Sequence, residues 1–442
     1  MLGLMPPTYD PRYLGPAPRD PDQTFWDPEM QTMPREQLDA LQLERLRELV
    51  GKLVEGKAPL FARKAKEAGL TSASDITSVA DINRIPLTRK QDLRDAEAEH
   101  PPFGDYRFTD ARECVRIGTS TGTTGTPTVA LWTRRDIWIE YESAARNWWR
   151  TGWRPGQIVT HAHPAYLYGG GPMLSGSLEY FGMLNVWVPP PDTDELAEQG
   201  INFWKRVHPD VSFVAFNYGR FVEVAAKLGV DLADDCGLPT FQLRGFGKKG
   251  LPLMTCGAEA YAYSSGAGPE CEGGHVHEDW GIIQAVDPET GTDVPDGRWG
   301  NLVCTTLDRD NAVVRYDLEE AVSIFTEPCP CGETTKRAFW GGRFKEYLSV
   351  QGHYFNVNEV EQALRSVEAV TQPTLEYVVV KPTDADAPLR VRVELASGDP
   401  TAISGQCADA ISRDVGIKAD VEIVDREGLA RSGYKTTRLV DG

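Results

Sequence analysis

The chain has 442 residues, 41% of them hydrophobic, and its 65 acidic side chains outnumber 46 lysines and arginines, giving a formal charge of −19. This acidic balance argues against a surface that neutralises many phosphates, so we expect no nucleic-acid partner and no anionic membrane partner. No stretch reaches the roughly 18 consecutive apolar residues that predict a membrane-spanning helix.

The chain opens without a basic segment followed by a long apolar run, so we predict no secretion signal and a cytoplasmic protein. Its eight cysteines then indicate reduced thiols and not a disulfide framework. At about 150 residues per domain the length allows up to three domains, but one large α/β domain with a smaller appendage fits as well.

In chain order, leucines at helical spacing predict a helix over residues 33–69, with Pro34 in its first turn. From about residue 115, short β-branched and aromatic runs alternate with helical stretches, which predicts a largely parallel sheet flanked by helices. The expected strands include residues 115–117, 129–132, 157–160, 184–188 and 211–216.

A turn-rich segment over residues 287–300 precedes the strand-like 301–306, which predicts a β-hairpin. A second unit begins near Arg343 and mixes strand-like and helical stretches. We therefore predict two domains, residues 1–342 and residues 343–442, the second a small α+β domain. Its expected strands are 347–350, 375–380 and 391–395, and its expected helices are 358–367 and 401–415.

Residues 118–128 form a run of small residues with no bulky side chain, between two strand-like segments. Glycine lets backbone N–H groups turn toward an anion, and serine and threonine hydroxyls add donors without bulk. The pattern lacks the Gly-Lys-Ser/Thr ending of a Walker loop. We favour a phosphate-gripping hairpin over a merely flexible turn. The candidate donors are Ser120, Thr121, Gly122, Thr123, Thr124 and Gly125.

This loop, Ser120-Thr-Gly-Thr-Thr-Gly-Thr-Pro-Thr, resembles the nucleotide loop of the adenylate-forming superfamily. Further motifs resemble the phenylacetate-CoA ligase family and follow its order along nearly the whole chain. They are Ile85-Pro-Leu-Thr-Arg-Lys, Tyr168-Gly-Gly-Gly, Glu270-Cys, His277-Glu-Asp, Arg315-Tyr, Pro328-Cys-Pro-Cys-Gly and Gly342-Arg. The resemblance implies an α/β fold, with a large N-terminal domain containing parallel sheets and a small mobile α+β C-terminal lid.

The resemblance also implies an activity, which is ATP- and Mg²⁺-dependent conversion of an aromatic carboxylic acid to an acyl-AMP, followed by thioester formation with coenzyme A. The expected enzyme is a monomer or homodimer. Two alternatives stay open. A ligase of the same fold could pass the acyl-AMP to an amine or another acceptor, and a degenerate chain could serve as a non-catalytic binding subunit.

The family's motifs map candidate roles onto this chain. Lys435 matches the late catalytic lysine, and Arg343 a nucleotide contact before the hinge, where Lys345 stands in place of the usual Asp. Glu320, one methylene longer than the family's Asp, matches the carboxylate that accepts from the ribose hydroxyls, with Glu319 or Asp317 as alternatives. The family's Tyr-Gly-x-Ser/Thr-Glu motif, which supplies an aromatic ring beside the adenine and a Glu for Mg²⁺, is altered here. Either Glu259 supplies the Mg²⁺ carboxylate, or Tyr261 and Tyr263 supply the aromatic ring with no Glu behind them. Residues near Gly352 and Phe355 would line the coenzyme A tunnel.

The resemblance places the acyl pocket where aromatic rings and glycines form a flat apolar slot. The candidate residues are Tyr166, Tyr168, Gly169, Gly170 and Phe216. Phe216 stands where the family has a smaller, more polar segment, which changes the shape of the slot and leaves the acid open.

Five soft or borderline metal ligands occur in two short segments, namely Cys271, His275, His277, Cys329 and Cys331. A structural zinc site takes four such ligands, whereas the alternative is small buried thiols beside a surface histidine pair. The family pattern favours a structural Zn²⁺ on Cys271, His275, Cys329 and Cys331. His277 is the reserve ligand, because it would share a strand face with His275.

Overall fold

The structure is a computed structural model that describes residues 15–16, 19–120, 127–162, 169–213, 218–238, 251–252, 265–266, 271–343, 347–371, 375–429 and 438–441. Contacts divide the chain into two compact units. The first comprises Met1–Gln157, Ala165–Asn185 and Pro252–Trp340, and the second Ile158–Pro164, Val186–Leu251 and Gly341–Gly442. The chain passes into the second unit for the last time after Trp340, and the domain boundary at residue 343 stays a prediction.

The first unit begins with helices, several of which pack apolar side chains into one core. They are α1 Pro28–Gln31, α2 Arg35–Val54, α3 Pro59–Glu67, η2 Ala73–Asp75, η3 Val79–Arg84, α4 Lys90–Glu99 and η4 Ala111–Glu113. Those that contribute to the core are α2, α3, η3 and α4. The single helix predicted over residues 33–69 is wrong at its middle. Gly56 and Ala58 both adopt positive φ, which ends α2, and Pro59 then starts α3. Pro34 caps α2 instead of lying in its first turn.

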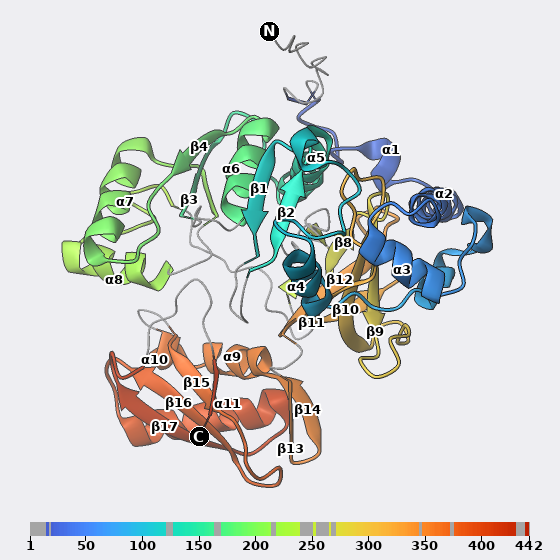
Figure 1. Cartoon of the computed structure of the whole chain (residues 1–442). Helices are drawn as coiled ribbons and strands as arrows, with labels where there is room; N and C mark the ends of the chain where they lie inside the picture. The colour runs from blue at the N-terminus through green and yellow to red at the C-terminus, as the bar shows by residue number, and fades with distance from the viewer. Residues whose placement is uncertain are drawn as a thin grey trace. The chain divides into compact units, whose positions relative to one another are not determined.

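The predicted hairpin around the small-residue loop is confirmed at both of its flanks. Strand β1 Arg116–Thr119 pairs antiparallel with β2 Val129–Trp132, and Thr119 opposite Val129 closes the ladder. Helices α5 Arg134–Arg150 and α6 Gly170–Phe181 pack against each other beside this hairpin (Figure 1). Thr133 caps α5 in a reciprocal capping box with Asp136, so the helix starts directly after β2.

The first unit also holds most of a seven-stranded sheet with the order β7-β8-β12-β11-β10-β9, in which β6 pairs with β12. Its strands are β6 Leu251–Pro252, β7 Ser265–Gly266, β8 Gly274–Val276, β9 Gly281–Val286, β10 Trp299–Thr306, β11 Tyr316–Phe325 and β12 Arg337–Arg343. The predicted hairpin over residues 287–306 is confirmed as β9–β10. The pairs β7–β8, β8–β12, β9–β10 and β10–β11 are antiparallel.

The α/β fold class is confirmed, and parallel pairing lies in the second unit. Strand β3 Ile158–His161 pairs parallel with β5 Val211–Phe213 in a sheet that also contains β4 Leu184–Trp187. Helices α7 Asp194–Val207 and α8 Tyr218–Leu228 accompany this sheet and pack on each other through Trp204 and Phe221. The large sheet differs from the expected parallel pattern because turns and loops, and not helical crossovers, join its strands from β8 to β12, where the structure describes every connection.

The rest of the second unit is the predicted α+β segment. A four-stranded sheet, ordered β17-β16-β15-β18, shares a core with α9 and α11, and β13 pairs with β14 as a separate hairpin. The elements are β13 Tyr347–Val350, β14 His353–Asn356, α9 Val357–Arg365, α10 Glu368–Thr371, β15 Tyr377–Val380, β16 Leu389–Leu395, α11 Pro400–Val415, β17 Ala419–Asp425 and β18 Leu439–Val440. Within the described ranges, no helix is long and apolar enough to cross a membrane.

Candidate active site

The base of the small-residue loop is closed by paired side chains. The Ser120 hydroxyl accepts hydrogen bonds from the Thr128 backbone N–H and from the Thr128 hydroxyl, each at 3.0 Å. The Ser120 N–H donates to the Thr128 carbonyl at 2.9 Å, and both side chains are buried. The two ends of the loop are therefore locked together.

The loop base also lies against the glycines predicted for the acyl pocket. The Gly169 N–H donates to the Thr119 carbonyl at 3.4 Å. A Cβ on Gly118 would lie 3.0 Å from the Trp132 ring and 3.1 Å from the Gly169 Cα, and a Cβ on Gly169 would lie 2.8 Å from the same ring. Only glycine allows this close approach, and Gly170 then begins α6.

Several predicted site residues lie outside the described part of the chain. They are Thr121, Gly122, Thr123, Thr124, Gly125, Tyr166, Tyr168, Phe216, Glu259, Tyr261, Tyr263, Lys345 and Lys435. Their roles stay predictions. Among the described candidates, the structure brings together the flanks of the loop, Gly169 and Gly170 within the first unit.

Glu320, the candidate ribose carboxylate, lies on an irregular stretch of β11, here called the β11 bulge (residues 315–320). The pairing register between β10 and β11 shifts between Asn301 and Val303, opposite this stretch. Arg315 and Glu319 both have left-handed backbone, with φ of 44° and 56°. The Trp340 indole donates to the Glu320 carboxylate at 2.9 Å, so the carboxylate has a defined direction.

Arg315 anchors the start of the β11 bulge, a role that the sequence reasoning missed although it had noted the Arg-Tyr pair. Its buried guanidinium donates to the carbonyls of Asn83, Ile85 and Gly291 at 2.6 to 3.0 Å. The Arg315 carbonyl accepts from the Thr88 N–H at 2.8 Å. Two backbone segments, residues 83–85 and the turn at Gly291, therefore meet on one side chain, which ties the Ile85-Pro-Leu-Thr motif to the β11 bulge.

The remaining nucleotide and coenzyme A candidates belong to the second unit. Arg343 ends β12. Gly352 and Gln351 form the two-residue turn between β13 and β14, both with positive φ as a type I′ turn requires, and Gly352 is exposed. Phe355 is 1% exposed and packs in the core of this unit, so its side chain supports the hairpin from within.

The four predicted zinc ligands come together in the first unit. The ligand atoms of Cys271, His275, Cys329 and Cys331, here called the cysteine–histidine cluster, all lie within 4.8 Å of one another. The His275 Nε2 is 3.2 Å from the Cys331 Sγ. Zinc bonds of about 2.3 Å to sulfur and about 2.0 Å to nitrogen can span such a group, so the donor set fits a tetrahedral ion.

Hydrogen bonds around the cluster also suit a metal. The His275 Nδ1 lies 3.2 Å from the Thr335 carbonyl and 3.0 Å from its hydroxyl, so Nδ1–H can donate there and leave Nε2 toward the cysteines. Hydrogen bonding from Cys271 and His275 lowers the pKa of the Cys331 thiol to about 4. The pKa of the Cys271 thiol is raised, because it donates to Cys331 and is partly buried.

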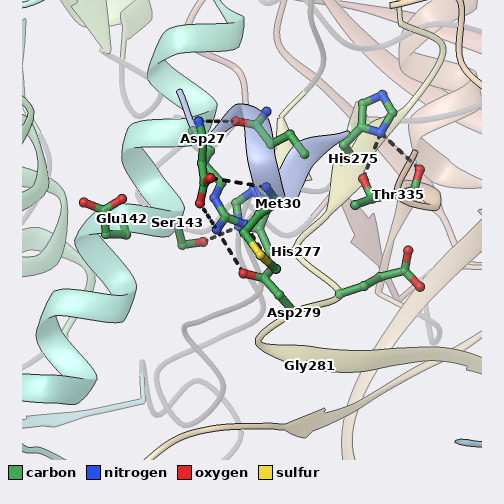
Figure 2. A network of polar contacts seen from close by, with 12 residues as sticks. Asp27, Met30, Glu142, Ser143, His275, His277, Asp279, Gly281 and Thr335 are labelled. Atoms are coloured by element: carbon green, nitrogen blue, oxygen red, sulfur yellow. Dashed lines mark hydrogen bonds and ion pairs between the residues drawn. The ribbon is translucent and has the colours of Figure 1, made fainter. Parts of the chain in front are cut away.

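His277, the reserve ligand, lies away from the cysteines. Its Nδ1 is 2.6 Å from the Ser143 hydroxyl, and its Nε2 is 3.2 Å from the Arg150 guanidinium. Figure 2 shows His275 directed toward Thr335 and His277 directed toward Ser143 on α5. Burial lowers the pKa of His277 well below its usual value, and the neighbouring arginines Arg150 and Arg146 lower it further.

A second feature beside the cluster was missed by the sequence reasoning. Arg150, at the end of α5, forms a buried ion pair with Glu333, which lies two residues after Cys331. Glu333 also accepts from the Gln31 amide and from the Thr335 hydroxyl, each at 3.2 Å. The alternation of charges in the sequence holds no signal for this pair, since its partners are 183 residues apart.

The chain was compared with known proteins. Residues 357–442 match the family model of the AMP-binding enzyme C-terminal domain. Phenylacetate-coenzyme A ligase of Thermus thermophilus is 32% identical over 392 residues, which cover 84% of each chain. Phenylacetate-coenzyme A ligase of Escherichia coli is 27% identical over 445 residues, covering 95% of this chain and 98% of its own.

Among solved structures, 2-hydroxyisobutyryl-CoA ligase in the postadenylation state, in complex with R3-HIB-AMP, has a similar fold. It superposes with a TM-score of 0.84 at 23% sequence identity and covers 98% of this chain and 95% of its own. At this identity the likeness concerns the fold, which is that of an adenylate-forming enzyme.

Proposed function

Because the chain belongs to the phenylacetate-coenzyme A ligase family, we propose that it joins an aromatic carboxylic acid to coenzyme A at the expense of ATP. The enzyme is an AMP-forming acid–CoA ligase, and the aromatic character of the acid is the more specific part of the proposal. The observation that carries the proposal is the 32% identity over 84% of both chains. The packing of the loop base on Gly169 supports it, because the loop predicted to bind phosphates then lies beside the segment predicted to bind the acid.

The reaction runs in two displacements. The carboxylate oxygen attacks the α-phosphorus of ATP, pyrophosphate leaves, and the acid becomes an acyl-AMP whose leaving group is stable. The thiolate of coenzyme A then attacks the acyl carbon, forming the C–S bond and releasing AMP. The first step requires donors and cations around the phosphates, since the pentavalent transition state carries spread negative charge.

This chain's residues divide that task in the proposal. The loop residues Thr121, Gly122, Thr123, Thr124 and Gly125, with Ser120 at its base, donate to the phosphates, and Lys435 and Arg343 supply positive charge. Glu320 accepts from the ribose hydroxyls. Glu259 is the candidate carboxylate for Mg²⁺, which offsets phosphate charge when it is bound with ATP.

The acid is expected between Tyr166, Tyr168, Gly169, Gly170 and Phe216, where flat rings would favour an aryl group. Residues 343–442 form a lid in this proposal. The lid presents Lys435 for adenylation and then the segment around Gly352 for coenzyme A. The enzyme would work as a monomer or homodimer.

We further propose that the cysteine–histidine cluster holds one structural Zn²⁺. Four protein ligands leave no open position, so the ion would join the segments around residues 271–275 and 329–331 and take no part in the reaction. The hydrogen bonds of His275 Nδ1 to Thr335 support this assignment.

Pyrophosphate release tests the activity. The full-length protein is mixed with ATP, Mg²⁺ and a panel of phenylacetates and benzoates, with short hydroxy acids as a second arm. Release with aryl acids, and acyl-CoA only when coenzyme A is added, is the expected result. Preference for the hydroxy acids would overturn the aromatic assignment. Hydroxamate formation without any acyl-CoA would favour a different acceptor, and no release with any acid would contradict the activity itself.

A further inference from the structure

The β11 bulge concentrates backbone strain at one point of a strand. Arg315 and Glu319 lie four residues apart, and each adopts a left-handed conformation that a Cβ makes unfavourable. Strained residues of this kind persist only where their surroundings hold them, and they gather at functional sites. Arg315 is held by the three carbonyls that its side chain binds, whereas the exposed Glu319 needs another cause.

That cause is the side chain of Asp317. Its Oδ1 accepts from the Glu319 backbone N–H at 2.8 Å, which closes a tight side-chain-to-backbone turn across Leu318. The same oxygen accepts from the Asn301 side-chain amide at 2.6 Å, and Asn301 is itself buried on β10. The Asp317 N–H donates to the Thr88 carbonyl at 2.8 Å, so Asp317 is fixed through both its backbone and its carboxylate.

Glu320 follows this turn directly. The backbone direction at Glu319 decides on which side of β11 the Glu320 side chain leaves, because a strand alternates its side chains between faces. The Trp340 indole then orients the carboxylate by donating to its Oε2 at 2.9 Å. A glutamate side chain is long and flexible, so its carboxylate depends on such guidance to keep one direction.

We propose that Asp317 is a positioning residue for nucleotide recognition. Its carboxylate holds the left-handed turn at Glu319 and thereby directs Glu320 toward the ribose hydroxyls of ATP. This inference rests on the ATP binding of the proposed function, since Glu320 meets a ribose only if the chain binds ATP.

Binding measurements test the inference without any acid. Calorimetry with ATP and with 2′-deoxy-ATP, each with Mg²⁺, gives the ratio of the two dissociation constants for the full chain. We expect Asp317→Ala to reduce the wild-type preference for ATP about tenfold, the effect of losing one charged hydrogen bond. The double variant Asp317→Ala/Glu319→Gly should recover most of that preference, because glycine adopts positive φ without the hydrogen bond to Asp317.

Two further variants separate positioning from stability. Asp287→Ala is the matched control, because Asp287 holds a comparable turn by accepting from Glu289 and Thr290 N–H groups at 2.9 and 3.0 Å in the β9–β10 connection. It should leave the ratio unchanged. Asp317→Asn keeps an acceptor at Oδ1 and should retain the preference for ATP. It is the variant to measure if Asp317→Ala fails to fold.

The outcomes are distinct. Equal weakening of ATP and 2′-deoxy-ATP by Asp317→Ala, or no recovery in the glycine double variant, would overturn the inference and leave the ligase activity standing. Wild-type ATP selectivity without pyrophosphate release for any acid would contradict the proposed reaction and leave the inference standing. If wild-type protein bound neither nucleotide, both would fail.

Discussion

Helix α5 carries a buried ion pair toward each end, and the pKa of the carboxyl group differs between the two pairs. In the N-terminal half, Glu140 contacts Arg309 from the connection between β10 and β11. At the C-terminal end, Arg150 contacts Glu333 beside the cysteine–histidine cluster. All four side chains are almost fully buried.

The surroundings shift the pKa of the two carboxyl groups in opposite directions. Burial raises the pKa of Glu140 to about 7, which the Arg309 charge only partly offsets and the nearby Asp136 increases. Burial also acts on Glu333, but the Arg150 charge, the neighbouring His275 and the hydrogen bonds from Arg150 and Gln31 outweigh it and lower its pKa. A buried ion pair thus keeps its charge when further donors satisfy the carboxylate, and not through the arginine alone.

The largest expected effect concerns the C-terminal end, where the cluster adjoins Glu333. Cys331→Ser removes one of four ligands, so we expect about one Zn²⁺ per chain in the wild type and nearly none in the variant, with a lower melting temperature. Elemental analysis after dialysis measures the content. Cys114→Ser is the control, since Cys114 lies outside the cluster. A wild-type protein that is fully folded without zinc would refute the metal assignment.

Breaking the Arg150–Glu333 pair comes next. Arg150→Met leaves a buried carboxylate without its cation, and we expect the free energy of unfolding to fall by about 3–5 kcal/mol in a urea titration. Arg63, whose side chain is 57% exposed where it pairs with Asp105, provides the control, because Arg63→Met should cost at most about 1 kcal/mol. Adding Glu333→Gln to Arg150→Met should recover part of the loss, and no recovery would speak against the unpaired charge as its cause.

The N-terminal pair predicts a pH dependence. Glu140 has a pKa of about 7 in the folded chain against 4.5 for an ordinary glutamate, so the folded state binds the proton more tightly. Its stabilising contribution is complete below pH 4.5 and is lost as pH rises through 7, a decline of about 3 kcal/mol. In urea titrations across this range, the free energy of unfolding should fall with rising pH, and Glu140→Gln should flatten this dependence. Glu142→Gln, on the same helix, should keep the dependence, because it leaves Glu140 intact.

The smallest expected effect concerns the β11 bulge, which follows Arg309 in the chain. Glu319→Gly alone relieves a left-handed residue, which should stabilise the fold by at most about 1 kcal/mol after the greater freedom of the unfolded chain is counted. Thermal unfolding measures it. A clear loss of stability would mean that the Glu319 side chain makes contacts that outweigh its backbone strain.

What could be predicted from the sequence was set by residue identity and spacing. The cysteine–histidine cluster could be predicted from thiols and imidazoles in two short segments together with the family pattern, and the structure brings those four side chains together. The β1–β2 and β9–β10 hairpins followed from small residues and turn residues between apolar runs.

What could not be predicted depends on contacts between distant segments or on backbone conformation. Gly56 and Pro59 do signal the break in the first long helix, although the leucine spacing does not. The left-handed Ala58 between them, a residue type that favours helix, and the left-handed Glu319 carry no signal of their own. The choice between His275 and His277 required knowing that Ser143 and Arg150 of α5 lie beside the second ring. Ser120, expected as a phosphate donor, also closes the loop base through Thr128, which only the pairing of β1 with β2 reveals.

The shared contact of Gly118 and Gly169 with one buried indole has a consequence for how such an enzyme can change. Because both glycines rest on Trp132, a side chain introduced at either position would displace the ring that supports the other. Under the proposed function, the loop for the nucleotide and the segment for the acid then both pack on the Trp132 ring. New acid specificity should therefore arise farther along the pocket wall, where a substitution can reshape the slot without disturbing how ATP is held.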